Sequence, residues 1–189
     1  MNFNHIFNKR EKHEKFKFVA ISDNATFKDS ICIALDNIFI SLEEAIHNLT
    51  EKQLHSFSVE NHGCVGWIAM HILGNIEYYV NHMVTGKPPI TGYGGMFGYG
   101  ANPREADVPS LEKIILLLNN VRNNSYHVLD SIKETHLLEN IENNPINWKR
   151  TILDAYNRVI NHAHAHINQI WLLKGVLRIK SNWPQQHWA

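Results

Sequence analysis

The sequence is short of three things: long apolar runs, an excess of charge of either sign, and cysteine. No apolar run reaches the roughly 18 to 20 residues that a membrane-spanning helix needs. The N-terminal stretch MNFNHIFNKREKHEKFKF contains no apolar segment of the kind found in secretory signals. Lysine plus arginine number 18, as do aspartate plus glutamate, so the net charge favours neither nucleic acid nor an anionic membrane as a partner. We therefore expect a cytoplasmic protein that binds neither.

Only two cysteines are present, Cys32 and Cys64, and they form no CxxC pair. Two isolated cysteines give no disulfide framework. Each lies in an apolar helical stretch, where a small buried hydrophobe is the expected role. The sequence also has no GxSxG nucleophile elbow. We therefore expect no catalytic nucleophile from the protein itself.

The apolar positions of the chain recur at alternating spacings of three and four, as in helices that line the core of a bundle. Four long helices are predicted, at about residues 26–49, 65–84, 110–134 and 149–177. The chain has 189 residues, which is enough for one domain and short for two. We predict an all-α protein with an N-terminal arm at 1–22 and a single four-helix-bundle domain at 23–189.

The second and third predicted helices are joined by a long connection, residues 86–109, which glycine and proline interrupt throughout. It does not match a phosphate-binding loop, because no strand precedes it and no GK[ST] closes it. A long connection without secondary structure inside a compact domain is usually functional or a crossover. Its aromatic residues, Tyr93, Phe97 and Tyr99, predict that it packs down on the bundle.

Histidine is abundant, with 13 residues, and two histidines stand where a bundle seam calls for leucine. The predicted seam of the fourth helix runs through Ile152, Ala155, Val159, His162, His166, Gln169, Leu173 and Val176. His162 and His166 are four residues apart, so both imidazoles lie on one face of the helix and can bind one metal ion. His164 points away. In a chain this rich in histidine, the alternative is that both rings are hydrogen-bonded in the core without a metal.

His71 supplies a third candidate ligand, on a stripe of the second helix that it shares with Trp67. His82 lies on the same stripe, but eleven residues along a helix is about 16 Å, too far for the same ion. Ala163 stands where the HExxH zinc peptidases need a glutamate, so that class is excluded. Three neutral ligands leave open positions on a metal, as in catalytic sites more often than in structural ones.

The depth of the histidines along the bundle predicts how the helices run. His71 is near the start of its helix, whereas His162 and His166 lie in the second half of theirs. The three can be level only if the second and fourth helices are antiparallel. An up-down-down-up order meets this condition, and it needs a long crossover between the second and third helices. The 86–109 connection occupies that position, so we predict an up-down-down-up four-helix bundle.

These residues together resemble the DinB/YfiT-like family of proposed metalloenzymes. The resemblance covers about residues 25–177 and depends on GWIAMHILGNIEYY, which contains Trp67 and His71, and on NHAHAHINQIWLL, which contains His162, His166 and Gln169. Asn168 stands where the family often has glycine. The resemblance implies the same bundle, the three-histidine site and a bound divalent ion, zinc or nickel, with iron or manganese as further candidates. Better-understood relatives use the metal to activate a low-molecular-weight thiol, in transferases and in a thiol-dependent isomerase.

Three functions remain open from the sequence. The first is a metal-dependent enzyme of small molecules, similar to a thiol S-transferase, in which a thiol or water held by the metal is the nucleophile. The second is a hydrolase that uses metal-bound water, and the third is a non-catalytic metal sensor or storage bundle. A carboxylate that orients the histidines would favour an enzyme, and Glu43, Glu44, Glu77 and Asp154 are the candidates for it.

The expected partner is a small-molecule substrate, with a low-molecular-weight thiol as a second substrate. We expect the 86–109 connection and the aromatic tail around Trp183 and Trp188 to shape the substrate pocket. The sequence leaves a homodimer open, and it identifies neither the substrate nor the metal.

Overall fold

The computed structural model describes residues 26–56, 63–93, 95–98, 100–103, 107–142 and 150–179. Within these ranges the regular structure is helical, apart from one isolated β-bridge. The predicted all-α class is therefore confirmed for the described part of the chain. The predicted arm at 1–22 lies outside the described residues, as do Tyr99, Trp183 and Trp188.

The first long helix, α2, spans Phe27–Ile46 and begins at a reciprocal cap. The Thr26 hydroxyl accepts from the backbone N–H of Asp29, and the Asp29 carboxylate accepts from the backbone N–H of Thr26 at 2.8 Å. The cap satisfies two N–H groups at the start of the helix that would otherwise lack partners. A second cap of the same kind starts the single turn α3, Glu51–Leu54. α2 lies within the predicted range 26–49.

The second predicted helix is continuous but not uniform. α4 spans Val65–Ile76, the π-helix η1 follows at Glu77–His82, and α5 ends the run at Met83–Thr85. Gly86 closes it with a φ of 72°, a left-handed conformation that costs glycine least. A π turn holds one extra residue, so it changes which side chains face inward. The carboxylate of Glu77, at the start of this turn, is buried.

The third long helix, α6, spans Leu111–Ser131, and the Ser110 hydroxyl accepts from the backbone at its start. The sequence pattern extends this helix to residue 134, which is three residues too far. Ile132 is extended, with φ −83° and ψ 130°, and this conformation breaks the helical path. A short 3-10 helix, η2 (Glu134–Leu138), follows the break.

The last long helix, α7, spans Ile152–Val176. Thr151 and Asp154 form a reciprocal cap at its start, in which the Asp154 carboxylate accepts from the backbone N–H of Thr151 at 3.0 Å. The predicted start at about 149 is three residues early, because the cap rather than the charged run before it begins the helix.

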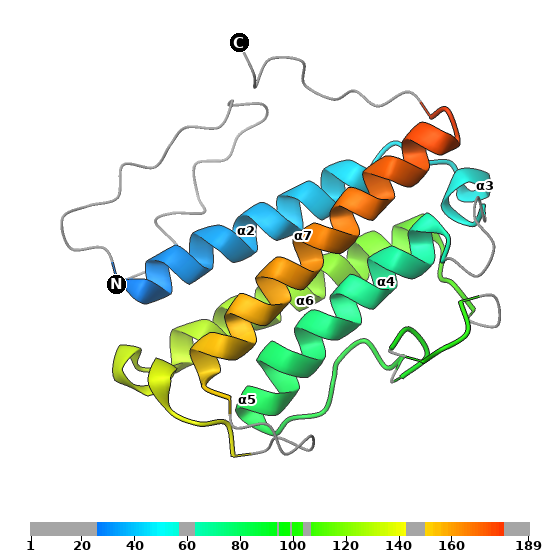
Figure 1. The fold of residues 1–189 in the computed structure, drawn as a ribbon. Coiled ribbons are helices and arrows are strands. Elements are labelled where there is room, and N and C mark those ends of the chain that lie inside the picture. Colours follow the sequence, from blue (N-terminus) through cyan, green and yellow to red (C-terminus); the bar gives the residue numbers. More distant parts are fainter. Residues whose placement is uncertain are drawn as a thin grey trace, which may run out of the picture.

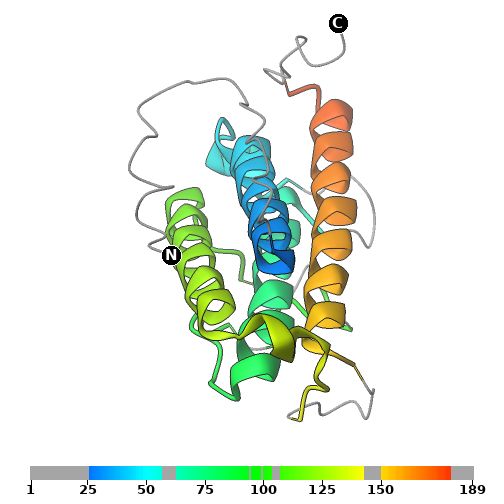
Figure 2. The same cartoon turned by 90° about the vertical axis from the view of Figure 1, so that its left-hand side faces the viewer.

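The four long helices pack side by side around one apolar core (Figure 1). α2 and α4 each pack against both α6 and α7, and α6 and α7 stand on opposite sides of α2 in the view of Figure 2. The most deeply buried side chains come from all four helices and include Leu35, Phe39, Ile72, Ile76, Leu118, Val121, Tyr156 and Val159. Burial of each large apolar side chain contributes about 1.5 to 3 kcal/mol. Within the described ranges, none of the helices has both the length and the hydropathy that crossing a bilayer requires.

The 86–109 connection is largely exposed, but it is attached to the bundle at Phe97, as its aromatic residues predict, and at Ile90. Phe97 is 4 % exposed and packs edge-on against Tyr93, with ring centroids 5.7 Å apart. The buried Glu77 carboxylate accepts from the backbone N–H of Ile90 at 2.7 Å. These contacts fix the connection beside the second helix and place Phe97 next to the histidines.

Candidate metal centre

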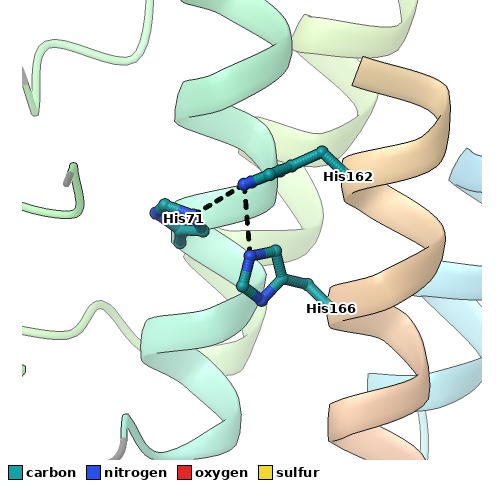
Figure 3. A group of neighbouring side chains, drawn as sticks. All are labelled: His71, His162 and His166. Atoms are coloured by element: carbon teal, nitrogen blue, oxygen red, sulfur yellow. Dashed lines mark hydrogen bonds between the residues drawn. The ribbon is translucent and has the colours of Figure 1, made fainter. Parts of the chain in front are cut away.

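The three predicted histidines converge from two neighbouring helices (Figure 3). His71 is on the second turn of α4, and His162 and His166 are on successive turns of α7. The Nε2 atoms of His71 and His162 lie 3.3 Å apart, and those of His162 and His166 lie 3.2 Å apart. α4 and α7 pack directly against each other, which brings residues far apart in the sequence to one point.

The histidines are half-buried, at the edge of the core rather than inside it. The buried stripe of α7 consists of Ala155, Tyr156, Val159, Ala163, Ile167, Ile170, Leu173 and Lys174. The prediction that His162 and His166 occupy core seam positions is therefore wrong by about one residue, and Val176, its predicted end, is 56 % exposed. Two neighbouring stripes of this helix both fit a helical period. Packing decides which stripe is buried: the apolar side chains lie in the core, and the imidazoles lie at its edge.

His71 is held by two contacts that orient its ring. The indole of Trp67 stacks on the imidazole, with ring centroids 5.2 Å apart and planes 7° from parallel. The Nδ1–H of His71 donates to the backbone carbonyl of Phe97, in the 86–109 connection. A neutral imidazole carries one proton, so a proton fixed at Nδ1 leaves a lone pair at Nε2. That lone pair points toward His162.

His166 is oriented in the same way by its own helix. Its Nδ1–H donates to Oε1 of Gln169, three residues on, at 2.7 Å, so its Nε2 also carries a lone pair in the neutral ring. Nδ1 of His162 is buried and has no hydrogen-bond partner among the described residues. A neutral His162 has one proton and can satisfy only one of its two close Nε2 neighbours. One cation at the point of convergence would satisfy all three lone pairs.

The surroundings favour the neutral form of His71 and His162. Burial lowers the pKa of His162 to about 4, with the neighbouring His166, His71 and Arg158 contributing in that order. Burial also lowers the pKa of His71, partly opposed by its hydrogen bond to Phe97. Only a deprotonated imidazole nitrogen binds a metal, so both shifts favour the binding-competent form at neutral pH.

The spacing of the three nitrogens fits a divalent transition ion. Two imidazoles bound at about 2.0 to 2.1 Å with a tetrahedral angle between them place their nitrogens about 3.4 Å apart. The observed separations from His162 are 3.3 and 3.2 Å, and one nitrogen from each histidine lies within 4.8 Å of the others. Among the described residues no fourth protein ligand joins the three imidazoles, and this matches the open coordination of catalytic sites. The cluster can therefore hold a metal ion and leave positions for small molecules.

The four carboxylates proposed to orient the histidines have other places in the structure. Glu77 holds the 86–109 connection, and Asp154 caps α7. Glu43 accepts from the guanidinium of an arginine on α6 at 3.0 Å, and Glu44 is exposed. The proposed carboxylate role is therefore not filled by any of these four residues.

A carbonyl and an amide orient the rings instead, through Phe97 and Gln169. Every residue has a backbone carbonyl, so the sequence carries no signal for the role of Phe97. The role of Gln169 has a signal, because a side chain three residues after a histidine lies on the same face of a helix. In both contacts the partner atom is an oxygen that accepts, which has the same effect on the proton position as a carboxylate.

The two histidines excluded from the cluster lie elsewhere, as predicted. His164 is exposed on α7. His82 is at the end of η1, where its Nδ1–H donates to the carbonyl of Lys87 at 2.8 Å. Neither belongs to the converging group.

The fold and the cluster together define a class of helical bundles with a three-histidine site. The sequence pattern of the DinB superfamily matches residues 39–170, more than half of the chain and all three histidines. The chain belongs to the DinB superfamily.

A crystal structure of a protein from Enterococcus faecalis, described as the conserved protein of locus, has the same fold with a TM-score of 0.69. The two sequences are 17 % identical, and the structural match covers 82 % of this chain and 99 % of the Enterococcus faecalis chain. At this identity the likeness concerns the fold alone. No curated protein sequence matches this chain.

Proposed function

We propose that this protein is a metal-dependent enzyme of small molecules, of the thiol S-transferase type, with His71, His162 and His166 as its protein ligands. The observation that carries the proposal is the convergence of three Nε2 atoms, two of which have their lone pairs fixed inward by hydrogen bonds at Nδ1. A zinc or nickel ion held there, or iron or manganese, would lower the pKa of a bound thiol or water and so supply a nucleophile at neutral pH.

The residues around the cluster support a site that small molecules can reach. The three rings are half-buried, and His162 lines a groove that opens to solvent. Trp67 and Phe97 pack against each other and His71, with ring centroids of the first two 6.3 Å apart. The indole of Trp67 covers one face of the His71 ring with apolar surface.

Neither cysteine competes for the role of nucleophile. Burial and, to a smaller extent, the nearby carboxylates of Asp36 and Asp29 raise the pKa of Cys32 to about 11. Burial also raises the pKa of Cys64. Both therefore stay protonated at neutral pH and are poor nucleophiles. Cys64 is buried, as predicted, whereas Cys32 is only half-buried.

The up-down-down-up order of the helices is part of the proposal. Along α2, Asp36 accepts from Tyr126 and Glu43 accepts from Arg122, both at 3.0 Å. From the first of these contacts to the second, the residue number rises on α2 and falls on α6. This supports opposite chain directions for the two helices. An experimental structure in which α4 and α7 run parallel would contradict the order.

The ends of α2 and α7 support the same order. The buried Nζ of Lys174 donates to the carbonyl of Ala45 at 2.9 Å, and each residue lies near the carboxyl end of its helix. Figure 1 supports it too, since the blue start of α2 and the orange start of α7 lie toward the end of the bundle where the green α5 finishes. The connection 86–109 would then be the crossover between α4–α5 and α6.

The proposals for substrate class, cellular location and domain organisation are those expected from the sequence. We propose a small-molecule substrate and a cytoplasmic location for a single domain at 23–189. The equal numbers of acidic and basic residues argue against nucleic acid or an anionic membrane as partner. A homodimer is compatible with the proposal and is not needed for it, because one chain supplies all three histidines.

The test is conjugation of small thiols to chlorodinitrobenzene, in which an S–C bond forms, chloride leaves and the thiol proton goes to solvent. We expect the metal-loaded protein to accelerate the reaction, and the chelated protein and His166→Ala to leave it at the uncatalysed rate. Equal rates in all three, together with metal-dependent ester or amide hydrolysis, would identify a hydrolase instead. Tight metal binding without either activity would identify a sensor or storage protein.

A further inference from the structure

Glu77 begins the π turn η1, and the residue is 1 % exposed. Both of its carboxylate oxygens face backbone donors of the 86–109 connection. Oε1 accepts from the N–H of Ile90 at 2.7 Å and from the N–H of Thr91 at 3.2 Å, and Oε2 accepts from the same Thr91 N–H at 3.2 Å. A buried carboxylate requires such donors, so Glu77 is a firm attachment point for the connection.

The same connection carries the acceptor that orients a proposed metal ligand. Phe97 is six residues after Thr91 in the chain, and its carbonyl accepts from the Nδ1–H of His71. The Phe97 ring is buried, which keeps that carbonyl close to the helix. A short path of chain therefore links the carboxylate of Glu77 to the imidazole of His71.

Hydrogen bonds inside the connection limit its freedom between these two attachments. The N–H of Met96 donates to the carbonyl of Tyr93 at 3.2 Å, and the N–H of Gly98 donates to the carbonyl of Gly95 at 2.9 Å. Phe97 lies within the second of these turns. Its carbonyl moves with its neighbours, so a displacement at residues 90 and 91 is passed on to it.

The two attachments lie on different sides of one helical run. His71 and Glu77 are six residues apart, which in an α-helix corresponds to about 9 Å along the axis and about 120° around it. Figure 1 shows the connection, in green, beside α4. A connection held at one point can swing about that point, whereas two points on different sides fix its position and its rotation.

The size of the effect follows from the length of chain that would be left free. The helical run closes at Gly86, eleven residues before Phe97, whereas Thr91 is six residues before it. Without the Glu77 contacts the free length nearly doubles, which lowers the local concentration of the Phe97 carbonyl at His71 about threefold. Complete loss of an orienting partner weakens metal binding about 10- to 100-fold. Loosening of that partner should therefore weaken it about three- to tenfold.

We propose that Glu77 is a positioning residue of the metal site, which acts on His71 through the 86–109 connection. Its carboxylate holds the connection, and the connection holds the Phe97 carbonyl. That carbonyl fixes the proton of His71 at Nδ1 and leaves the Nε2 lone pair for the cluster. The inference rests on the proposed function for the metal but not for the orientation of the ring.

The first experiment needs no metal. Nuclear magnetic resonance of the imidazole nitrogens in the chelated protein shows which nitrogen of His71 carries the proton, and in the wild type it should be Nδ1. Glu77→Met has a similar length and no acceptor oxygen, so it should move the proton to Nε2 in part of the population. Glu77→Gln keeps an acceptor oxygen and should resemble the wild type. His166 is the internal control, because its Nδ1–H donates to Gln169 on its own helix, and it should change in neither variant.

The second experiment measures zinc affinity by competition with a chromogenic chelator. Glu77→Met should weaken zinc binding about three- to tenfold, and Glu77→Gln should retain most of the affinity. Val121→Ala is the control for lost stability, because it opens a cavity in the core from α6, a helix that supplies none of the three histidines. It should lower the melting temperature and leave the zinc affinity unchanged.

The third measurement uses the wild type, so it does not depend on whether a variant folds. Coupling between two sites is reciprocal, so zinc should slow hydrogen exchange at the backbone amides of Ile90 and Thr91 by about three- to tenfold as well. The amide of Ile132, which bonds to the carbonyl of Leu129 at the end of α6, is the control and should exchange equally fast with and without zinc.

A His71 ring that keeps its proton at Nδ1 in Glu77→Met would overturn the inference whatever the metal does. Amides of Ile90 and Thr91 that bound zinc leaves unprotected would overturn it as well. A moved proton in a protein that binds no zinc would instead overturn the proposed function, and the orientation of His71 through Glu77 would stand.

Discussion

The Nδ1–H of His71 donates to the backbone carbonyl of Phe97, 26 residues further along the chain. One of the three converging histidines is therefore oriented in part by the 86–109 connection, which lies outside its own helix. The buried Phe97 ring fixes the position of that carbonyl, and the stacked Trp67 fixes the plane of the imidazole. The connection is thus part of the site, which explains why a stretch so rich in glycine and proline packs against the bundle.

Metal content is the first prediction. Protein purified without chelator should carry close to one divalent transition ion per chain, because three lone pairs converge on one point. Removing the ion should lower the melting temperature, since a ligand present at about 100 times its Kd stabilises the folded state by about 2.7 kcal/mol. Elemental analysis and calorimetry check this. Absence of metal, with no thermal shift on addition of zinc or nickel, would rule out the metal site.

The second prediction assigns the ligands. His71→Ala, His162→Ala and His166→Ala should each weaken metal binding by orders of magnitude, because each removes one of three protein ligands. His164→Ala and His82→Ala are the matched controls and should bind as the wild type does, since both side chains lie outside the cluster. Competition with a chromogenic chelator measures the affinities. Loss of metal in His164→Ala but not in His166→Ala would mean that α7 is rotated from its position here.

The third prediction concerns the amide that orients His166. Gln169→Ala should weaken metal binding by about 10- to 100-fold, because the imidazole loses the acceptor that fixes its proton at Nδ1. Gln169→Glu keeps an acceptor at that position and should restore most of the affinity. Asn168→Ala, at an exposed neighbouring position, serves as the control. If Gln169→Glu and Gln169→Ala bound metal equally weakly, the hydrogen bond would not be the cause.

The fourth prediction is a pH dependence of the metal-free protein. The pKa of His162 is lowered by burial to about 4 from an ordinary 6.5, and burial lowers that of His71 as well. Between these two pH values the unfolded chain binds protons that the folded chain does not. The free energy of unfolding should therefore be highest above pH 6.5, fall as the pH drops through the window, and level off below about 4.

Urea denaturation of the chelated protein across this window measures the effect. His162→Gln removes the titrating ring with the lowest pKa and should flatten the pH dependence. A free energy of unfolding that rises as the pH drops through the same window would contradict the burial of these rings.

The fifth prediction compares two glycines of α4. A Cβ at Gly66 would lie 2.6 Å from Val108 and 3.0 Å from Leu54, whereas a Cβ at Gly74 would meet no heavy atom within 4 Å. Gly66→Ala should therefore destabilise the protein by about 1 to 3 kcal/mol through overpacking. Gly74→Ala should stabilise it by about 0.5 to 1 kcal/mol, because alanine is the better helix former. Thermal denaturation checks both, and a stabilised Gly66→Ala would mean that the 86–109 connection does not pack there.

Much of the fold could be predicted from the sequence, because periodicity and caps are local. The spacing of apolar residues marked all four long helices, and the ends were wrong by about three residues where a cap or an extended residue decided them. The π turn at Glu77–His82 could not be predicted, since it depends on what the inserted residue packs against and not on its own type.

The three histidines of the site could also be predicted, because their spacing on α7 and their level along the bundle are properties of the sequence. How deeply these histidines are buried could not be predicted. On α7, the row of residues through His162 and the neighbouring row through Ala163 both fit a helical period, and only packing shows that the second row is the buried one. The partners at Nδ1 were missed for two reasons. A backbone carbonyl such as that of Phe97 leaves no trace in the sequence, and the amide of Gln169 fills a role for which a carboxylate is the usual partner.

His71 and His162 are 91 residues apart in the chain, and their Nε2 atoms are 3.3 Å apart in space. During synthesis on a ribosome, the first of these histidines is made long before the second, and it has no companion until α7 has emerged. In a nascent chain, or in a fragment that contains α4 but not α7, His71 is a single imidazole and binds a metal ion only weakly. Retained metal would therefore mark molecules whose synthesis and folding are both finished, and the metal content of a cellular pool would measure its intact fraction.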